Sequence, residues 1–312
     1  MSYNLTPLYV KGIDENIHVT IAAYEAGWKP LFHIHETQAR YIDHQTWEGY
    51  QLPQARFPGG IIASGQFKPS FNKHFVIRSF GLQDQFPFED IEDDLYGVIH
   101  RMLPAKGGLF AQSFMDLMEI DTSNLLSIQG FASGSNVAGS PDGVSLFSSA
   151  HPISVSQPNV LWSNRSSINV DMSIAGAQAA ETALRLQKAP NNITVLQNEL
   201  DLVWFNPALK YIAQQVWRGQ WEVGTADRNE NFLRKKNVRL HAWPYWNKSG
   251  AVGTNNAWAA LGKKHHLHFF MRQGVRTKTQ SDIATNSEII ASTVRFDEGW
   301  TDPRGTWASN GL

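Results

Sequence analysis

Residues 140–152 read Ser-Pro-Asp-Gly-Val-Ser-Leu-Phe-Ser-Ser-Ala-His-Pro and are the most distinctive stretch of the chain. Asp142 and Gly143 form a tight-turn pair, because Asp hydrogen-bonds nearby backbone and Gly tolerates a positive φ. Leu146 and Phe147 follow as an apolar pair that can anchor the turn. A surface turn with one buried Phe explains these residue types, but it does not explain their order.

The stretch lies in a long region, residues 130–170, that is rich in Gly, Ser, Asn and Pro, and this composition predicts loops. The segments that we expect after it mix helix and strand. They are a helix over residues 171–188 with Asp171 as its N-cap, a buried strand at 200–205, a helix that Asn206 caps and Pro207 starts, and strands near 241–243, 267–271 and 289–296.

Before the stretch, residues 59–82 predict a two-stranded ribbon. Residues 61–68 and 74–80 have the composition of strands, and the turn is expected at residues 69–72 because Pro, Ser and Asn favour turns. Two strands alone are marginally stable in water, so the apolar side chains of the ribbon must pack on their own domain or on a neighbouring subunit. These side chains are Phe67, Phe71, Phe75, Ile77 and Phe80.

Helices are expected after the ribbon. Pro87 and the acidic residues at 89–94 are typical of a first helical turn, since carboxylates favour the positive end of the helix dipole. Apolar residues from Ile91 to Met102 share one helical face. Pro104 and a Gly pair predict an interruption, and a second helix is expected over residues 109–129.

The first 58 residues are mixed in composition. Their prolines, among them Pro7, Pro30 and Pro53, favour an extended path over a compact subdomain. A short helix is expected only between Glu36 and Trp47.

The composition excludes several classes of protein. The chain has 312 residues, 42% of them hydrophobic, which is enough for one large domain or two small ones. It has no cysteine, so it has no disulfide scaffold, thiolate metal site or Cys nucleophile. Its net charge of −1 lacks the basic excess of a dedicated nucleic-acid binder. The amino terminus does not resemble a signal peptide, and no apolar run approaches the roughly 20 residues of a membrane span, so we expect a soluble protein made in the cytoplasm.

The histidines are the candidates for a metal site. His33 and His35 lie on one face of a strand-like segment, and His44 can join them, so a metal-dependent hydrolase that uses these three residues remains an alternative. A zincin-like motif that begins at His35 is incomplete, because Ala39 occupies the place of its second His. The histidines at 265–268 are interpreted as part of a solvated or intersubunit strand.

Other catalytic motifs are missing from the sequence. It contains no phosphate-binding loop, dinucleotide fingerprint or nucleophile elbow. The basic run at 234–236 is interpreted as a solvated face. The 11 tryptophans are scattered, which favours core and interface packing over a carbohydrate platform. We therefore predict a protein that is not an enzyme, with no catalytic residue, cofactor or bound metal.

Four segments resemble, in sequence order, the major capsid proteins of tailed bacteriophages. Residues 142–152 are similar to their "DG-x-x-LF-x-x-x-HP" segment, notably in the Mu-like major head subunits. Residues 56–94 look like the family's E-loop leading into its P-domain, and residues 202–213 resemble a segment that often reads "LLVPP-x-L-x-x-A". Residues 296–305 resemble the common closing "fGW-x-D-x-RG", so the resemblance covers about residues 56–312.

The resemblance implies an α+β fold, the Hong Kong 97-type capsid fold. Its expected parts are an extended N-terminal arm at 1–58, an E-loop β-ribbon at 59–82, a P-domain with a long spine helix at 83–131, an A-domain at 132–285 and a returning P-domain strand at 286–312.

The resemblance also implies a structural function. Subunits of this family form pentamers and hexamers that close an icosahedral shell around double-stranded DNA, so we expect a virion protein assembled in the host bacterial cytoplasm. The expected partners are other copies of the chain, a separate scaffolding protein, a portal and weakly bound packaged DNA, with no cofactor and no membrane. Phe67, Phe71 and Phe75 are the expected intersubunit contacts. An encapsulin-like compartment shell remains an alternative.

Overall fold

The computed structural model describes residues 6–87, 89, 93, 98–132, 140–166, 170–222, 229–246 and 256–311. The α-helices are α1 (Thr6–Ala23), α3 (Val98–Asn124), α4 (Ile174–Leu186) and α5 (Lys210–Arg218). Short helical turns are η1 (Lys29–Leu31), η2 (Leu125–Gln129), η3 (Pro207–Leu209) and η4 (Phe232–Lys235). The strands are β1 (His33–Glu36), β2 (Tyr41–Trp47), β3 (Pro69–Val76), β4 (Arg78–Pro87), β5 (His151–Pro152), β6 (Leu161–Trp162), β7 (Leu200–Phe205), β8 (Arg239–Ala242), β9 (Trp258–Gly262), β10 (Leu267–Asp282), β11 (Ser287–Trp300) and β12 (Thr306–Ser309).

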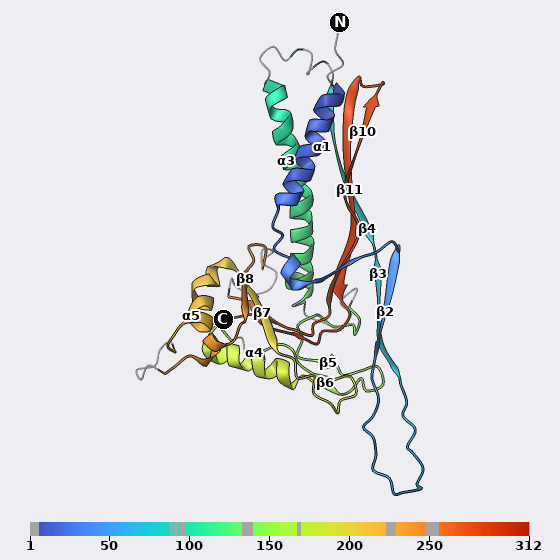
Figure 1. Cartoon of the computed structure of the whole chain (residues 1–312), viewed down its shortest axis with the longest axis vertical. Coiled ribbons are helices and arrows are strands. Elements are labelled where there is room, and N and C mark those ends of the chain that lie inside the picture. Colours follow the sequence, from blue (N-terminus) through green and yellow to red (C-terminus); the bar gives the residue numbers. More distant parts are fainter. Residues whose placement is uncertain are drawn as a thin grey trace.

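Most of these strands form two four-stranded sheets. The long sheet has the order β1-β10-β11-β4, and the second sheet has the order β12-β9-β7-β8. Two further pairs are the ribbon β2-β3 and the short pair β5-β6. Helices α1 and α3 lie along the long sheet, and α4 and α5 accompany the second sheet (Figure 1). The chain is therefore a mixed α and β protein, as the sequence predicts.

The amino-terminal region contains a helix where an extended path was expected. Helix α1 packs along α3. Ile17 of α1 is fully buried in a cluster with Ala111 of α3 and Ile290 of β11. Pro7 does not oppose this helix, because it stands in the first turn, where no N–H is needed. The prediction that residues 1–58 are an extended arm is therefore wrong for α1.

Helix α3 runs without a break through Pro104 and the Gly pair 107–108, where the sequence predicted an interruption. A Pro inside a helix costs about 3 kcal/mol, and each Gly costs about 1 kcal/mol. Phe114 and Met118 of this helix are buried in the core, so contacts along the helix outweigh the local preferences. The predicted helix start at 89–97 lies mostly outside the described residues.

The short helix that was expected between Glu36 and Trp47 is absent, because β1 ends at Glu36 and residues 41–47 form strand β2. Strand β1 pairs in parallel with β10, and β2 pairs antiparallel with β3. In β2, the partly buried Ile42 and His44 alternate with the exposed Tyr41 and Asp43. This period of two is that of a strand with one covered face.

The second sheet confirms several predictions. Strand β7 occupies residues 200–205 as expected, and the Asn206 side chain accepts a hydrogen bond from Ala208 N at 3.0 Å, as a helix N-cap does. The N-cap of α4 is Ser173, whose hydroxyl accepts from Gly176 N at 3.1 Å. The prediction of Asp171 as the cap is wrong, because α4 begins at Ile174 and only Ser173 stands in the N-cap position.

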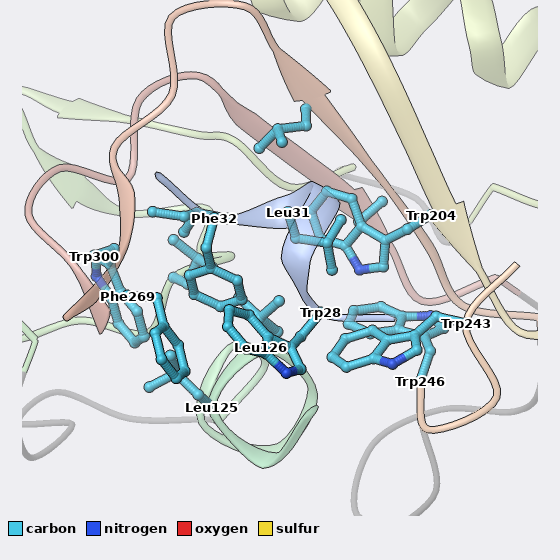
Figure 2. Packing of buried hydrophobic residues seen from close by; sticks show 14 of the residues in the cluster. Trp28, Leu31, Phe32, Leu125, Leu126, Trp204, Trp243, Trp246, Phe269 and Trp300 are labelled. Carbon is cyan, nitrogen blue, oxygen red and sulfur yellow. The ribbon is translucent and has the colours of Figure 1, made fainter. Parts of the chain in front are cut away.

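One aromatic core joins the two sheets. Trp204 of β7 and Phe269 of β10 belong to the same buried cluster. Trp28 stacks on Phe269 with ring centroids 4.0 Å apart, and Trp204 meets Trp246 edge to face at 5.6 Å (Figure 2). Separating the two halves would expose this aromatic area to water, so they pack as one body.

The boundary between the sheets differs from the expected division at residue 285. Strand β10 falls in the segment 132–285 but pairs with β11 in the long sheet. Strand β12 falls in the segment 286–312 but pairs with β9 in the second sheet. The reason is local, because residues 267–300 form one long antiparallel hairpin whose two strands stay together.

Candidate assembly surface

The ribbon is built from β2 and β3, which differ from the predicted pair of strands. Their register places Ile42 opposite Phe75. The predicted turn at residues 69–72 lies inside β3, because Pro69 takes the first position of the strand, where a missing N–H is tolerated. Residues 61–68, expected to be a strand, belong instead to the loop that joins β2 to β3.

Residues 48–68, which we call the apolar loop, extend away from the body beyond the ribbon (Figure 1). Phe57 and Ile61 are 87% and 96% exposed. Gly59 has φ +80°, and Gly60 N donates to the Phe57 carbonyl at 2.9 Å, so the loop turns at this point. Tyr50, Leu52 and Ile62 are also exposed. The apolar loop thus presents large side chains that its own chain leaves uncovered.

Apart from Phe67, the exposed residues of this loop were not identified as functional from the sequence. Sequence reasoning placed Ile61 and Ile62 in a strand and searched for aromatic side chains on the ribbon. The usable signal was the Gly59-Gly60 pair next to Pro58, which predicts a turn at that point of the chain.

Two of the expected intersubunit contacts are Phe67, which lies in the apolar loop next to the ribbon, and Phe71, which lies on strand β3. Phe67 stacks on Trp47 at 4.6 Å and on Tyr50 at 5.2 Å, and it remains about half exposed. Phe71 is partly buried in β3, and its carbonyl accepts a hydrogen bond from the Thr46 hydroxyl at 2.8 Å. Both side chains are accessible to a neighbouring molecule.

Phe75, the third expected contact, is fully buried on its own chain. Its ring lies 4.8 Å from the ring of Phe270 on β10. A Cβ atom added at Gly299 would come within 2.8 Å of the Phe75 ring, so only glycine leaves room for this close approach. The expectation of an intersubunit contact is therefore corrected for Phe75, because this residue fastens the ribbon to the long sheet.

Glu48 anchors the loop to the body at the end of β2. Its carboxylate accepts hydrogen bonds from Ser156 N at 3.0 Å and from the Ser156 hydroxyl at 2.6 Å. Burial alone would raise the pKa of Glu48, but the Ser156 hydrogen bonds outweigh it and hold the pKa below the usual 4.5. Near neutral pH this anchor is therefore a charged, hydrogen-bonded carboxylate.

A second charged group lies where the ribbon continues into β4. Arg78 pairs with Asp121 of α3 at 2.8 Å and with Glu298 of β11 at 2.6 Å. Asp297 accepts from Arg78 at 3.2 Å and from Val76 N at 3.1 Å. Burial, together with the charge of Asp121, raises the pKa of Glu298 to about 8. The guanidinium of Arg78 thus links helix α3 and strand β11 of the long sheet at the point where the ribbon continues into β4.

The stretch at 140–152 is a buried polar network. Asp142 and His151 are almost completely buried, and their side chains lie 2.6 Å apart. Burial alone would raise the pKa of Asp142, but the hydrogen bond and charge of His151 outweigh it and lower the pKa below 3.8. Leu146 and Phe147 are fully buried in the core, as predicted, and Gly143 has the positive φ of +77° that the turn requires.

The closing segment holds this loop region to the body. Arg304 binds Asp302 through two hydrogen bonds of 3.1 and 2.8 Å, and it donates to the Ile153 carbonyl at 2.7 Å. Asn164 donates to the Leu146 carbonyl at 2.6 Å and to the Thr306 hydroxyl at 3.1 Å. The residues that carry the family resemblance therefore have a structural role, because their hydrogen bonds hold this loop region on the body.

The three histidines of the hydrolase alternative lie in one neighbourhood but do not form a metal site. His35 Nε2 lies 3.0 Å from His268 Nδ1, and the His44 ring lies 5.8 Å from the His268 ring. His33 stacks on His265 at 4.0 Å. In the part of the chain that the structure describes, no three His, Asp or Glu side chains are placed to hold a metal ion. The geometry therefore gives this alternative no support.

Two of the three cations in the basic run at 234–236 form ion pairs within their own chain. Lys235 pairs with Glu230 at 3.0 Å, and Lys236 pairs with Glu181. Arg239 pairs with Asp201.

Among the described helices, none combines the length and apolarity needed to cross a bilayer.

Comparison with known proteins identifies the fold. No family model matches the sequence, and no curated protein matches it. Solved structures match over almost the whole chain. The mature capsid of bacteriophage PhiM1 has a TM-score of 0.57 and 11% identity, covering 93% of this chain and 88% of that chain. Microbacterium phage Oxtober96 gives 0.54 and 10%, with 93% and 92% covered, and the capsid of an empty GTA particle gives 0.54 and 8%, with 92% and 90% covered. The chain has the fold of phage capsid subunits.

Proposed function

We propose that this chain is the major capsid protein of a tailed bacteriophage. Copies of it would assemble into the pentamers and hexamers of an icosahedral shell around double-stranded DNA, with no catalytic step. The main support for the proposal is the apolar loop. Phe57 and Ile61 of this loop are exposed, because the loop extends away from the body of its own chain. The fold shared with phage capsid subunits supports the same conclusion.

The proposal assigns a role to each part of the fold. The ribbon and the apolar loop together act as the E-loop, so its proposed limits shift from residues 59–82 to residues 41–76. Helix α3 acts as the spine helix of a P-domain that also contains α1 and the long sheet. The second sheet with α4 and α5 acts as the A-domain. Membership of the Mu-like group, the scaffolding protein, the portal and assembly in a bacterial host belong to the same proposal.

Assembly would proceed by heterologous contacts, in which each subunit offers one patch to a different patch on the next. The apolar loop of one subunit lies on its neighbour, and rotation closes the ring. Phe67 and Phe71 remain proposed contacts, joined by Phe57 and Ile61. Burying a side chain of this size contributes about 1.5–3 kcal/mol before association costs, and a shell repeats that gain at each contact.

The test is particle formation by variants of the apolar loop. The double variant Phe57→Ser and Ile61→Ser removes two exposed apolar groups without touching the core. It should lose about 3–6 kcal/mol per contact, a weakening of roughly a hundredfold or more, and remain as soluble subunits. Negative-stain microscopy and sedimentation of the expressed protein measure the outcome.

A matched control keeps the apolar character at the same positions. The variant Phe57→Leu with Ile61→Val should still form particles, because its loop can bury similar area. Normal particles from the double Ser variant would contradict the proposal. The contents of the particles distinguish a phage head from an encapsulin-like compartment. We expect heads filled with DNA, and particles filled with a cargo protein would indicate the compartment.

A further inference from the structure

Six of the 11 histidines gather where the ribbon meets the long sheet. His35 Nε2 faces His268 Nδ1 at 3.0 Å, and the His44 ring lies over the His268 ring with centroids 5.8 Å apart. His33 and His265 stack at 4.0 Å. The six, which we call the histidine cluster, are His33 and His35 on β1, His44 on β2, His265 and His266 before β10, and His268 on β10.

The contact between His35 and His268 requires at least one neutral ring. Two imidazole nitrogens 3.0 Å apart, as in His35 and His268, form a hydrogen bond only if one of them carries no proton. His44 Nδ1 and His268 Nε2 are buried and have no hydrogen-bond partner, so neither has an acceptor ready for an additional proton. Protonation would therefore place like charges against each other beneath the ribbon.

Among the charged groups of the surrounding elements, Asp302 partly offsets this repulsion at His266, where burial still outweighs its charge. Two carboxylates near the cluster already form ion pairs with other side chains. Asp297 of β11 pairs with Arg78, and Asp302 pairs with Arg304. Lys73 of β3 lies beside the cluster's apolar neighbour, with Nζ 5.1 Å from the Phe75 ring. The other charged groups nearby are Arg239, whose charge acts on His265, the His74–Asp43 pair on the ribbon, and Glu36 at the end of β1.

Burial favours the neutral form of three members of the cluster, whereas His33 and His35 are exposed. Burial first, and then the neighbouring imidazoles, lower the pKa of His265 and of His268 to about 3. Burial also lowers the pKa of His266. An unburied His has a pKa of about 6.5. A lowered pKa means that the packed state is stabilised fully above about pH 6.5 and loses that stability as the pH falls towards 3.

We propose that the histidine cluster is a pH-sensitive latch, in which neutral imidazoles hold the ribbon on the long sheet and their protonation releases it. The part that detaches is the base of the ribbon, with Ile42, His44 and Phe75 leaving the face made by His268 and Phe270. The Glu48 anchor responds to a lower pH range, because its carboxylate stays charged down to below 4.5. Between pH 6.5 and 4.5 only the histidine latch opens.

The latch does not depend on the proposed function, because it concerns one chain. A ribbon that has left its sheet is marginally stable, so its amide hydrogens exchange with solvent. Hydrogen exchange of the expressed protein, corrected for the pH dependence of the chemistry, therefore reports the opening. Between pH 7 and pH 5, protection of residues 74–78 should fall by up to about thirtyfold for each histidine freed. Protection in β7, which is lost only when the whole fold opens, should stay higher than that of residues 74–78 at both pH values.

Substitutions identify the groups that titrate. In the double variant His35→Gln and His268→Gln, residues 74–78 should lose most of this pH dependence. His18→Gln, an exposed residue on α1 paired with Asp14, is the matched control and should behave like the original chain. If the double variant fails to fold, His268→Gln alone should reduce the effect. A protection ratio that does not change between pH 7 and pH 5, or that changes equally in the double variant, would overturn the latch.

Discussion

At the scale of single residues, the buried pair Asp142–His151 shows how the most distinctive stretch acts. The sequence predicted a turn with an apolar anchor, and the structure has both. The hydrogen-bonded pair was not predicted, because its partners stand nine positions apart and sequence spacing alone does not indicate that they meet. The fixed spacing of Asp142 and His151 in this stretch is thus explained by their contact, because a buried carboxylate needs a buried partner.

Asp142→Asn tests this pair. It should lower the free energy of unfolding by about 3–5 kcal/mol, because a buried His loses its charged partner. Asp43→Asn is the matched control, since Asp43 and His74 also lie 2.6 Å apart but are about half exposed, and it should cost less than about 1 kcal/mol. Urea denaturation measures both, and equal losses would contradict the structural role of the stretch.

The pH dependence of the same pair has a defined sign. The pKa of Asp142 is lowered on folding, so its contribution is present above the unfolded value near 3.8 and is lost as the pH falls below it. The difference in unfolding free energy between the original chain and Asp142→Asn should therefore shrink below about pH 4. A difference that stays constant from pH 7 to pH 3 would contradict this sign.

At the scale of elements, strands and helices with strong local patterns were predicted, and those decided by distant contacts were not. Strand β7 and the Asn206 cap were predicted because apolar residues and a cap signal stand side by side in the sequence. Helix α3 was predicted as two helices, because Pro104 favours a break. The packing of the helix on α1 and the core outweighs that preference, and this packing cannot be inferred from the local sequence. The ribbon was shifted, because a strand beginning at Pro69 pairs with residues more than 20 positions away.

The seating of the ribbon depends on Gly299. Gly299→Ala should displace Phe75 and destabilise the chain by about 1–3 kcal/mol, since the added Cβ would lie 2.8 Å from the ring. Gly274→Ala on β10 is the control, because nothing lies within 4 Å of its added Cβ. Thermal denaturation compares the two, and an unchanged Tm for Gly299→Ala would show that Phe75 does not sit there.

The junction of α3, β11 and the ribbon predicts a second pH effect. The pKa of Glu298 is raised to about 8 on folding, so stability is present below the unfolded value near 4.5 and declines as the pH rises towards 8. Glu298→Gln keeps the shape of the neutral form, so its stability relative to the original chain should grow by about 1 kcal/mol per pH unit between pH 5 and pH 8. Urea midpoints across this range measure it, and parallel curves would contradict the assignment.

At the scale of the whole molecule, the fold class and the absence of a recognisable catalytic motif followed from the sequence. The apolar loop did not, because its exposed residues have no periodic pattern, and exposure depends on where the loop leaves the body. The central claim is that this loop is completed by another copy of the chain.

The most direct test is an electron cryo-microscopy map of the particles that the expressed chain forms. We expect closed shells in which a neighbouring subunit covers the side chains of Phe57 and Ile61. A chain that stays monomeric at micromolar concentration, or a shell in which this loop lies free in solvent, would contradict it.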